Sequence, residues 1–194
     1  MIYQFYVRTD CTATSDGYSI WAGPYNFRVG YCSISAPSNN DASGIKNVTF
    51  IGNGMEDDIN NPSTSTGHYS NYSNISTTVT AEESYDLSVN VDTASDSFST
   101  YTVYTRAWID WNNNGVFETD ESEEYNLGNT VGGNNNPTSL SPLSVTIPDD
   151  ALGSYRMRIK TVYGTTDPIP NPCTSQNYSE AEDYTIIVMA APCP

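Results

Sequence analysis

The sequence predicts an all-β fold, an antiparallel β-sandwich with long polar loops. Three observations lead to this prediction. Apolar and polar residues alternate with a period of two in short runs, and these runs are rich in Tyr, Val, Ile and Thr. Clusters of Gly, Pro, Asn or Asp separate them, as expected for strands joined by turns. No stretch of about 10–12 residues has the apolar spacing of an amphipathic helix.

The expected strands follow one another along the chain. Residues 3–7 and 19–27 form a first pair, joined by a hairpin around Asp16-Gly17. The segments 52–76 and 128–142 are rich in Asn, Ser, Thr and Gly, so we expect them to be long polar loops. Alternation of this kind favours an immunoglobulin-like or jelly-roll-like sandwich. Its strands are expected at residues 48–50, 87–91, 101–109, 143–147, 155–162 and 184–189.

Charge and composition exclude several classes of function. The chain has 194 residues, with 7 Lys and Arg against 23 Asp and Glu, a formal net charge of −16. Such a chain repels nucleic acid, because it has no basic surface to neutralise phosphates. No apolar run reaches the roughly 20 residues of a membrane-spanning helix. The single histidine, His68, leaves one possible base for a nucleophilic triad and too few imidazoles for a His-based zinc site. We therefore expect neither an enzyme nor a membrane-inserted protein.

Residues 110–121 resemble a twelve-residue calcium-binding loop. Oxygen-bearing residues occur at alternate positions, and Gly115 stands at the sixth, where such a loop turns sharply. The preceding residues alternate like a strand, so the loop follows a strand and not a helix. Its few carboxylates suggest affinity in the extracellular range of about 10⁻⁴–10⁻³ M. The alternative is an ordinary Asn/Asp/Gly turn. The expected ligands are Asp110, Asn112, Asn114, the carbonyl of Val116, Glu118 and Glu121.

A second group of charged residues comes from two late strands. Glu180 and Glu182 share one face of a strand, whereas Asp183 faces the other way. Arg156 and Arg158 also share a face and can pair with carboxylates through two hydrogen bonds. We expect a network of arginines and carboxylates that organises the sandwich. A second metal site is the alternative, and a pair of hydrolytic carboxylates is its enzymatic version.

Three separate motifs connect the sequence to a known family. They read Trp-Ile-Asp-Trp-Asn-Asn-Asn-Gly-Val-Phe at 108–117, Tyr-Arg-Met-Arg-Ile at 155–159 and Ser-Glu-Ala-Glu-Asp-Tyr-Thr at 179–185. Together they resemble the GEVED domain of secreted bacterial proteins, over residues 31–189. The resemblance implies a non-catalytic module of a large secreted or surface-attached protein. It also implies a disulfide between Cys32 and Cys173, whereas the four cysteines alone allow three pairings.

The two ends of the chain resemble neighbouring modules. Residues 3–11 and 19–27 resemble the last two strands of a fibronectin type III-like module, and residues 191–194 resemble the start of the next one. The expected organisation is 1–30 for the fibronectin-like strands, 31–189 for the GEVED-like sandwich and 190–194 for a linker. Cys11 and Cys193 would then belong to the neighbouring modules of a longer repetitive protein.

These features together suggest a function outside the cell. We expect a calcium-stabilised structural or adhesive module of a secreted, repetitive bacterial surface protein, adhesin or extracellular filament. Its partners would be neighbouring modules or subunits of the same protein. The alternative is a carbohydrate-binding accessory module of an extracellular hydrolase, in which Tyr72, Tyr101 and Trp111 stack on glycans.

Overall fold

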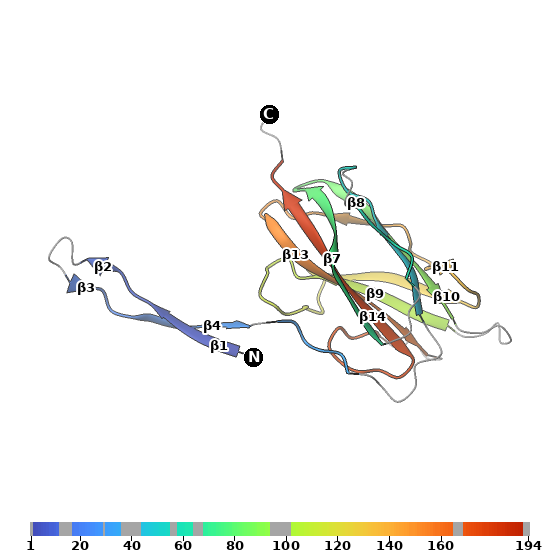
Figure 1. The fold of residues 1–194 in the computed structure, drawn as a ribbon, viewed down its shortest axis with the longest axis horizontal. Helices are drawn as coiled ribbons and strands as arrows, with labels where there is room; N and C mark the ends of the chain where they lie inside the picture. The colour runs from blue at the N-terminus through green and yellow to red at the C-terminus, as the bar shows by residue number, and fades with distance from the viewer. Residues whose placement is uncertain are drawn as a thin grey trace.

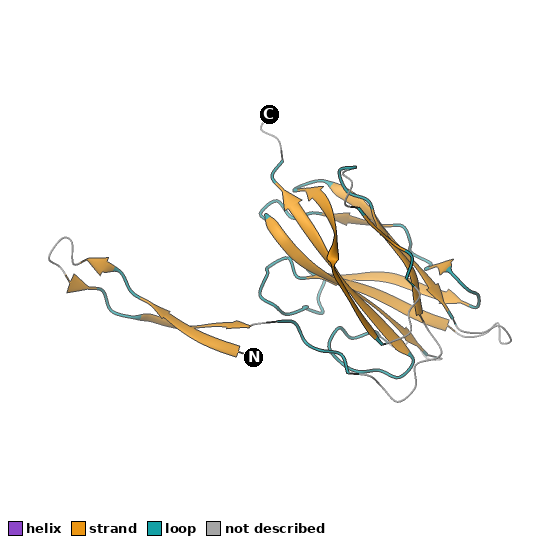
Figure 2. Cartoon of the chain, in the orientation of Figure 1, coloured by secondary structure: helices purple, strands orange, loops and turns teal. Residues whose placement is uncertain are grey.

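The computed structural model describes residues 2–11, 17–28, 30–35, 44–54, 58–63, 68–93, 102–164 and 169–191. Over these ranges the chain forms strands, turns and loops and contains no helix. Two sheets pack face to face, and a separate hairpin extends away from them (Figures 1 and 2). The predicted all-β sandwich is therefore confirmed.

We call the two layers sheet I and sheet II. Sheet I contains, in order across the sheet, β10 (Glu124–Val131), β9 (Thr102–Ile109), β13 (Gly153–Tyr163), β14 (Ser179–Met189) and β7 (Tyr69–Thr80). Sheet II contains β11 (Asn136–Pro137), β8 (Ser84–Asp92), β5 (Gly44–Phe50) and β6 (Ile59–Asn61), and β12 (Leu143–Thr146) also pairs with β8. All described pairs are antiparallel except β14 with β7, which is parallel.

The core lies between the inner faces of the two sheets. Met157 and Ile159 of β13 and Ile186 of β14 point inward from sheet I, and Val89 of β8 and Phe50 of β5 point inward from sheet II; all five are fully buried. Alternation then directs Arg156, Arg158 and Lys160 to the opposite face of β13. We call that side the outer face of sheet I.

Four strands lie wholly or partly where the sequence pattern suggested loops: the short strands β6 and β11, and the long strands β7 and β10. β7 begins at Tyr69, inside the segment 52–76, and β10 extends to Val131, inside 128–142. Both are edge strands of sheet I. An edge strand has only one neighbour and half of it faces water, so polar residues such as Ser70 and Asn71 are tolerated there. The long runs of apolar alternation identify the more central strands, which explains why the sequence pattern missed these two.

The hairpin at the start of the chain is made of β1 (Ile2–Val7) with β4 (Ala22–Arg28), and β2 (Asp10–Cys11) with β3 (Gly17–Tyr18). In Figure 1 it lies apart from the sandwich. Among its described side chains, Ile20 is 91% and Trp21 is 58% exposed. Arg8 stacks on the rings of Tyr18 and Trp21, a contact that lies within the hairpin itself.

Candidate metal centre

Backbone hydrogen bonds hold both ends of the loop between β9 and β10, one end against β13 and the other against β9. Asp110 follows β9 directly, and its backbone N–H donates to the carbonyl of Arg156 on β13 (3.1 Å). At the other end, the N–H of Ile109 donates to the carbonyl of Glu123 (3.0 Å). The loop therefore leaves and returns at neighbouring points, and the side chains at its two ends converge.

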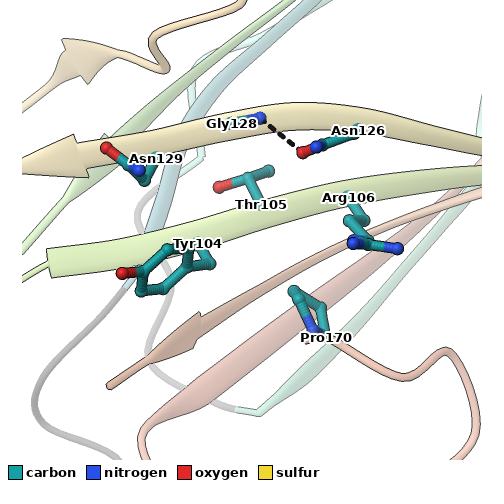
Figure 3. A pocket seen from close by; sticks show the side chains of 7 residues that line it. All are labelled: Tyr104, Thr105, Arg106, Asn126, Gly128, Asn129 and Pro170. Carbon is teal, nitrogen blue, oxygen red and sulfur yellow. Dashed lines mark hydrogen bonds between the residues drawn. The ribbon is translucent and has the colours of Figure 1, made fainter. Parts of the chain in front are cut away.

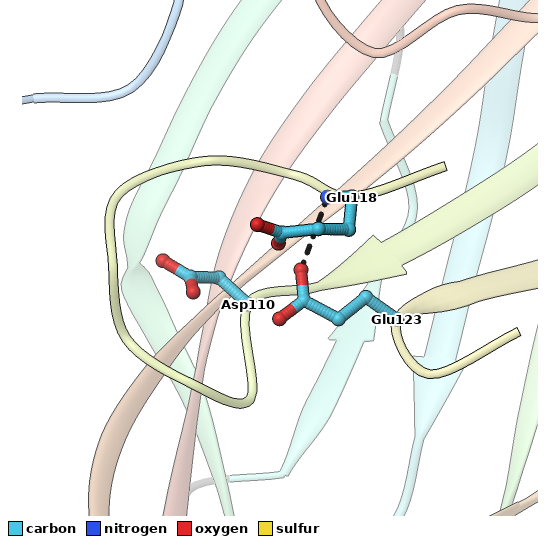
Figure 4. Close-up of side chains that lie close together, drawn as sticks. All are labelled: Asp110, Glu118 and Glu123. Atoms are coloured by element: carbon cyan, nitrogen blue, oxygen red, sulfur yellow. Dashed lines mark hydrogen bonds between the residues drawn. The ribbon is translucent and has the colours of Figure 1, made fainter. Parts of the chain in front are cut away.

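Three carboxylates meet inside this loop: those of Asp110, Glu118 and Glu123 (Figure 4). One oxygen atom from each lies within 4.8 Å of the other two. Asp110 and Glu123 are buried, with 0% and 1% of their surface exposed. Carboxylate oxygens in a compact group are the ligands that hard divalent cations prefer. The triad can hold a metal ion.

The loop backbone orients Asp110. Its Oδ1 accepts a hydrogen bond from the N–H of Asn114 (3.0 Å), and its Oδ2 accepts from the N–H of Gly115 (2.9 Å) and from the hydroxyl of Tyr31 (2.8 Å). Gly115 has a φ of 78°, a left-handed conformation that glycine adopts without a Cβ penalty. Burial, with the hydrogen bond to Asp110, raises the pKa of Tyr31 well above its usual range. Tyr31 is thereby kept as a hydrogen-bond donor.

Glu118 and Glu123 crowd each other. The N–H of Glu118 donates to Glu123 Oε2 (3.1 Å), and Asn114 Nδ2 donates to Glu118 Oε1 (2.8 Å). Glu118 Oε2 is buried without a hydrogen-bond partner among the described residues. Burial, and then the adjacent Glu118, raises the pKa of Glu123 to about 8. Two crowded carboxylates and an unpartnered oxygen fit a site completed by a cation.

The loop differs from the predicted ligand set at one acidic position. Glu121 is exposed, and the third carboxylate of the triad is Glu123. A turn causes the difference, because the N–H of Glu124 donates to the carbonyl of Asp120 (2.9 Å) as β10 begins. The twelve-residue spacing presumes a helix after the loop, whereas a strand follows here. The start of that strand was the signal that could have identified Glu123.

The amide ligands expected from the spacing face the loop itself. Asn112 Oδ1 accepts from the N–H of Asn114 (3.0 Å), and Asn114 Oδ1 accepts from the N–H of Val116 (2.7 Å). Both asparagines are exposed. In this structure they shape the loop, and the acidic triad is the group that could hold a metal ion.

The second predicted cluster is divided between two faces of sheet I. On the outer face, Arg158 pairs with Asp183 through two hydrogen bonds, Nε to Oδ1 (2.6 Å) and Nη2 to Oδ2 (2.8 Å). Arg156 lies 3.5 Å from the same carboxylate. Arg158 Nη1 also donates to the carbonyls of Cys32 (3.0 Å) and Pro172 (2.8 Å). Both arginines therefore lie against Asp183, and Arg158 also anchors the two segments that contain Cys32 and Pro172.

Glu180 and Glu182 point the other way, toward sheet II. Glu180 Oε2 accepts from the N–H of Ile45 on β5 (2.6 Å). Glu182 Oε2 accepts from the hydroxyl of Tyr184 (2.7 Å), which in turn accepts from Asn61 Nδ2 on β6 (2.8 Å). Burial raises the pKa of Glu182 to about 7. These two glutamates connect the sheets across the interior and do not join the arginines.

The segment before β14 is fastened onto the outer face. A disulfide joins Cys32 and Cys173, the pair that the family resemblance implied. Lys160 is fully buried, and its ammonium donates to the carbonyls of Asn171 (2.9 Å) and Thr174 (2.5 Å). Disulfides are characteristic of proteins in oxidising compartments, which supports the expectation of a secreted protein.

Two of the three aromatic residues predicted to stack on sugars, Tyr72 and Trp111, are engaged in packing. Tyr72 is half-buried, with its ring 5.7 Å from that of Tyr184. Trp111 is half-buried and donates its indole N–H to the hydroxyl of Tyr125 (2.8 Å). Tyr101 lies outside the described residues.

A family model matches part of the chain. No curated protein matches the chain. Within the described ranges no helix is long and apolar enough to cross a membrane. The matching family model extends from β9 to β14 and so includes the acidic triad, both arginines and the Glu-Ala-Glu-Asp segment. Residues 104–187 match the family model of the GEVED domain.

Proposed function

We propose that the chain is a non-catalytic, calcium-stabilised structural module of an extracellular bacterial protein. The observation that carries the proposal is the triad of Asp110, Glu118 and Glu123, in which two carboxylates are buried and one oxygen has no partner among the described residues. Calcium would neutralise these charges. It would thereby join the two ends of the loop between β9 and β10.

Calcium fits the donor set for chemical reasons. It takes six to eight oxygen ligands in a flexible shell, and backbone carbonyls and water commonly supply those that carboxylates do not. Outside cells calcium is present at concentrations that fill weak sites of about 10⁻⁴–10⁻³ M. The module would therefore stiffen after export, when the disulfide between Cys32 and Cys173 also forms.

Thermal unfolding tests this proposal. Millimolar calcium is expected to raise the unfolding midpoint of the full chain relative to chelator, because an ion that binds only the native state stabilises it by mass action. Glu123→Gln is expected to abolish the rise. Glu121→Gln is the matched control, since the same chemical change at an exposed residue outside the triad should leave the rise intact. An equal rise in both variants, or no rise in the wild type, would refute the proposal.

The hairpin suggests how such modules connect. Its residues Phe5, Tyr6 and Val7 are 44%, 52% and 48% exposed, and two-stranded hairpins alone are marginally stable in water. We infer that it packs against a neighbouring module or subunit of the same protein. Light scattering over a concentration series tests this: the full chain should associate and a chain lacking residues 1–28 should remain monomeric. Equal masses for both would contradict the inference.

A further inference from the structure

A groove on the outer face of sheet I provides a second candidate site. One hollow of about 260 Å³ lies over β9 and β10, where Tyr104, Arg106, Asn126 and Asn129 line it together with Pro170. Figure 3 shows Tyr104 and Arg106 side by side along β9, with Pro170 facing Arg106. We propose that this groove binds a sugar ring of a neutral glycan. The proposal goes beyond the scaffold role and does not depend on the metal ion.

The groove continues past its first hollow. A second hollow of about 330 Å³ shares Arg106 and Pro170 with the first and is also lined by Thr119, Glu124, Ile169 and Asn171. Each volume lies near or below the lower end of the roughly 300–1,000 Å³ found for drug-sized ligands. Two small adjoining hollows suit consecutive rings of an oligosaccharide better than one bulky molecule.

The chemistry of the lining favours a neutral, hydroxyl-rich ligand. Tyr104 is half-buried and offers a ring on which the apolar face of a sugar can stack. The amide of Asn129 can donate and accept hydrogen bonds at the same time, and the NH₂ group of Asn126 can donate, as paired hydroxyls require. Arg106 forms an ion pair with Glu124, so the groove has little net charge. The overall charge of −16 further disfavours an acidic ligand.

The shape of the groove is built into the fold. β10 has a bulge between Asn126 and Gly128, and Asn126 Oδ1 accepts from the N–H of Gly128 (2.9 Å), which leaves the Asn126 NH₂ group as a donor. Glycine is required there, because φ is 78° and a Cβ would lie 2.2 Å from Ser139 Oγ. The bulge therefore sets the spacing of the two asparagines.

The opposite wall is held in place before any ligand arrives. Lys160 binds the carbonyl of Asn171, and Arg158 binds that of Pro172. The next residue, Cys173, is tied to Cys32. Pro170 precedes these three anchored residues directly. A preorganised wall of this kind lowers the entropy lost on binding, which is the property expected of a binding site.

A peptide occupant fits this surface less well. Extended peptides commonly bind by adding a strand to an open sheet edge, and β10 is the edge strand nearest the groove. That edge is covered, because the N–H groups of Ser139 and Leu140 donate to the carbonyls of Asn129 (2.8 Å) and Leu127 (3.2 Å). The face of β9 and β10 is left as the accessible surface, and its lining is polar.

Nuclear magnetic resonance titration of the full chain tests the proposal. The probes are neutral hexoses, N-acetylhexosamines and their oligosaccharides at millimolar concentration, with calcium present. At least one probe is expected to shift the backbone amides of Gly128 and Asn129. Tyr104→Ala should weaken that binding about tenfold, as expected for loss of a stacking contact. Asn129→Ala provides a second variant, and Tyr18→Ala, at an exposed tyrosine of the hairpin, is the matched control.

The outcomes separate this site from the metal centre. No shift of these amides with any probe, or equal binding by the wild type and both groove variants, would overturn the proposal. Glu123→Gln should keep the sugar-induced shifts even when its calcium response is lost. If calcium has no effect on unfolding while the groove amides still shift, only the metal proposal fails.

Discussion

Replacing Cys32 and Cys173 by alanine is expected to lower the free energy of unfolding by about 5 kcal/mol. The disulfide joins residues separated by 141 positions in the sequence. In the chain-entropy model, a closed loop of that length restricts the unfolded chain by about 17 cal/mol/K, or about 5 kcal/mol at 25 °C. Single domains have stabilities of about 5–15 kcal/mol, so this loss is a large fraction of the total.

Urea denaturation, followed by tryptophan fluorescence and circular dichroism, measures this loss. Both proteins should carry Cys11→Ser and Cys193→Ser, so that no other thiol can exchange with the bridge. The double alanine variant should unfold at a much lower urea concentration, and reductant should affect only the protein that retains the bridge. A difference below about 1 kcal/mol would refute the reasoning, because the unfolded chain would then not be restrained by the bridge as the model requires.

Two further predictions concern the Glu-Ala-Glu-Asp segment. Asp183→Asn should cost about 3–5 kcal/mol in urea denaturation, because it leaves the buried Arg158 without its charge partner; Asp150→Asn, at an exposed residue, should change little. Glu182→Gln should remove a pH dependence. Burial raises the native pKa of Glu182 to about 7, whereas the unfolded value is about 4.3. The native state therefore binds the proton of Glu182 more tightly than the unfolded state does. The stabilisation that results is fully present below about pH 4 and is lost as the pH rises through 7. With calcium saturating, the wild type should lose about 3 kcal/mol between pH 4 and 8 relative to the glutamine variant; parallel pH profiles would contradict this.

The strands that make the core were predictable, because their inner faces are apolar. Val89 and Ile159 belong to such runs, and both are fully buried. The edge strands β7 and β10 were not predictable in the same way. One side of each lacks a neighbouring strand in its sheet, so their polar residues carry little periodic signal. The parallel pairing of β14 with β7 also depends on a long-range contact that no local pattern records.

The candidate site shows the same division. The spacing from Asp110 to Glu118 identified the loop and two of its three carboxylates. Glu123 was not among the predicted ligands. A turn at Asp120 leads the chain into β10, and Glu123 then joins the triad in place of Glu121. Which residue supplies the third carboxylate depends on how the loop packs against the strands. Residue spacing along the chain does not define it.

The sequence by itself determined the fold class, the central strands, the glycine-containing acidic loop and, through family resemblance, the disulfide. The tertiary structure alone decided which charges meet. Alternation along β14 predicts that Glu182 and Asp183 face opposite sides, but only the packing of the sheets shows what each side contains. There Asp183 pairs with Arg158, and Glu182 lies between the two sheets beside Tyr184. The physical reason is that burial and pairing depend on neighbours brought from distant strands, which set the electrostatic environment of each side chain.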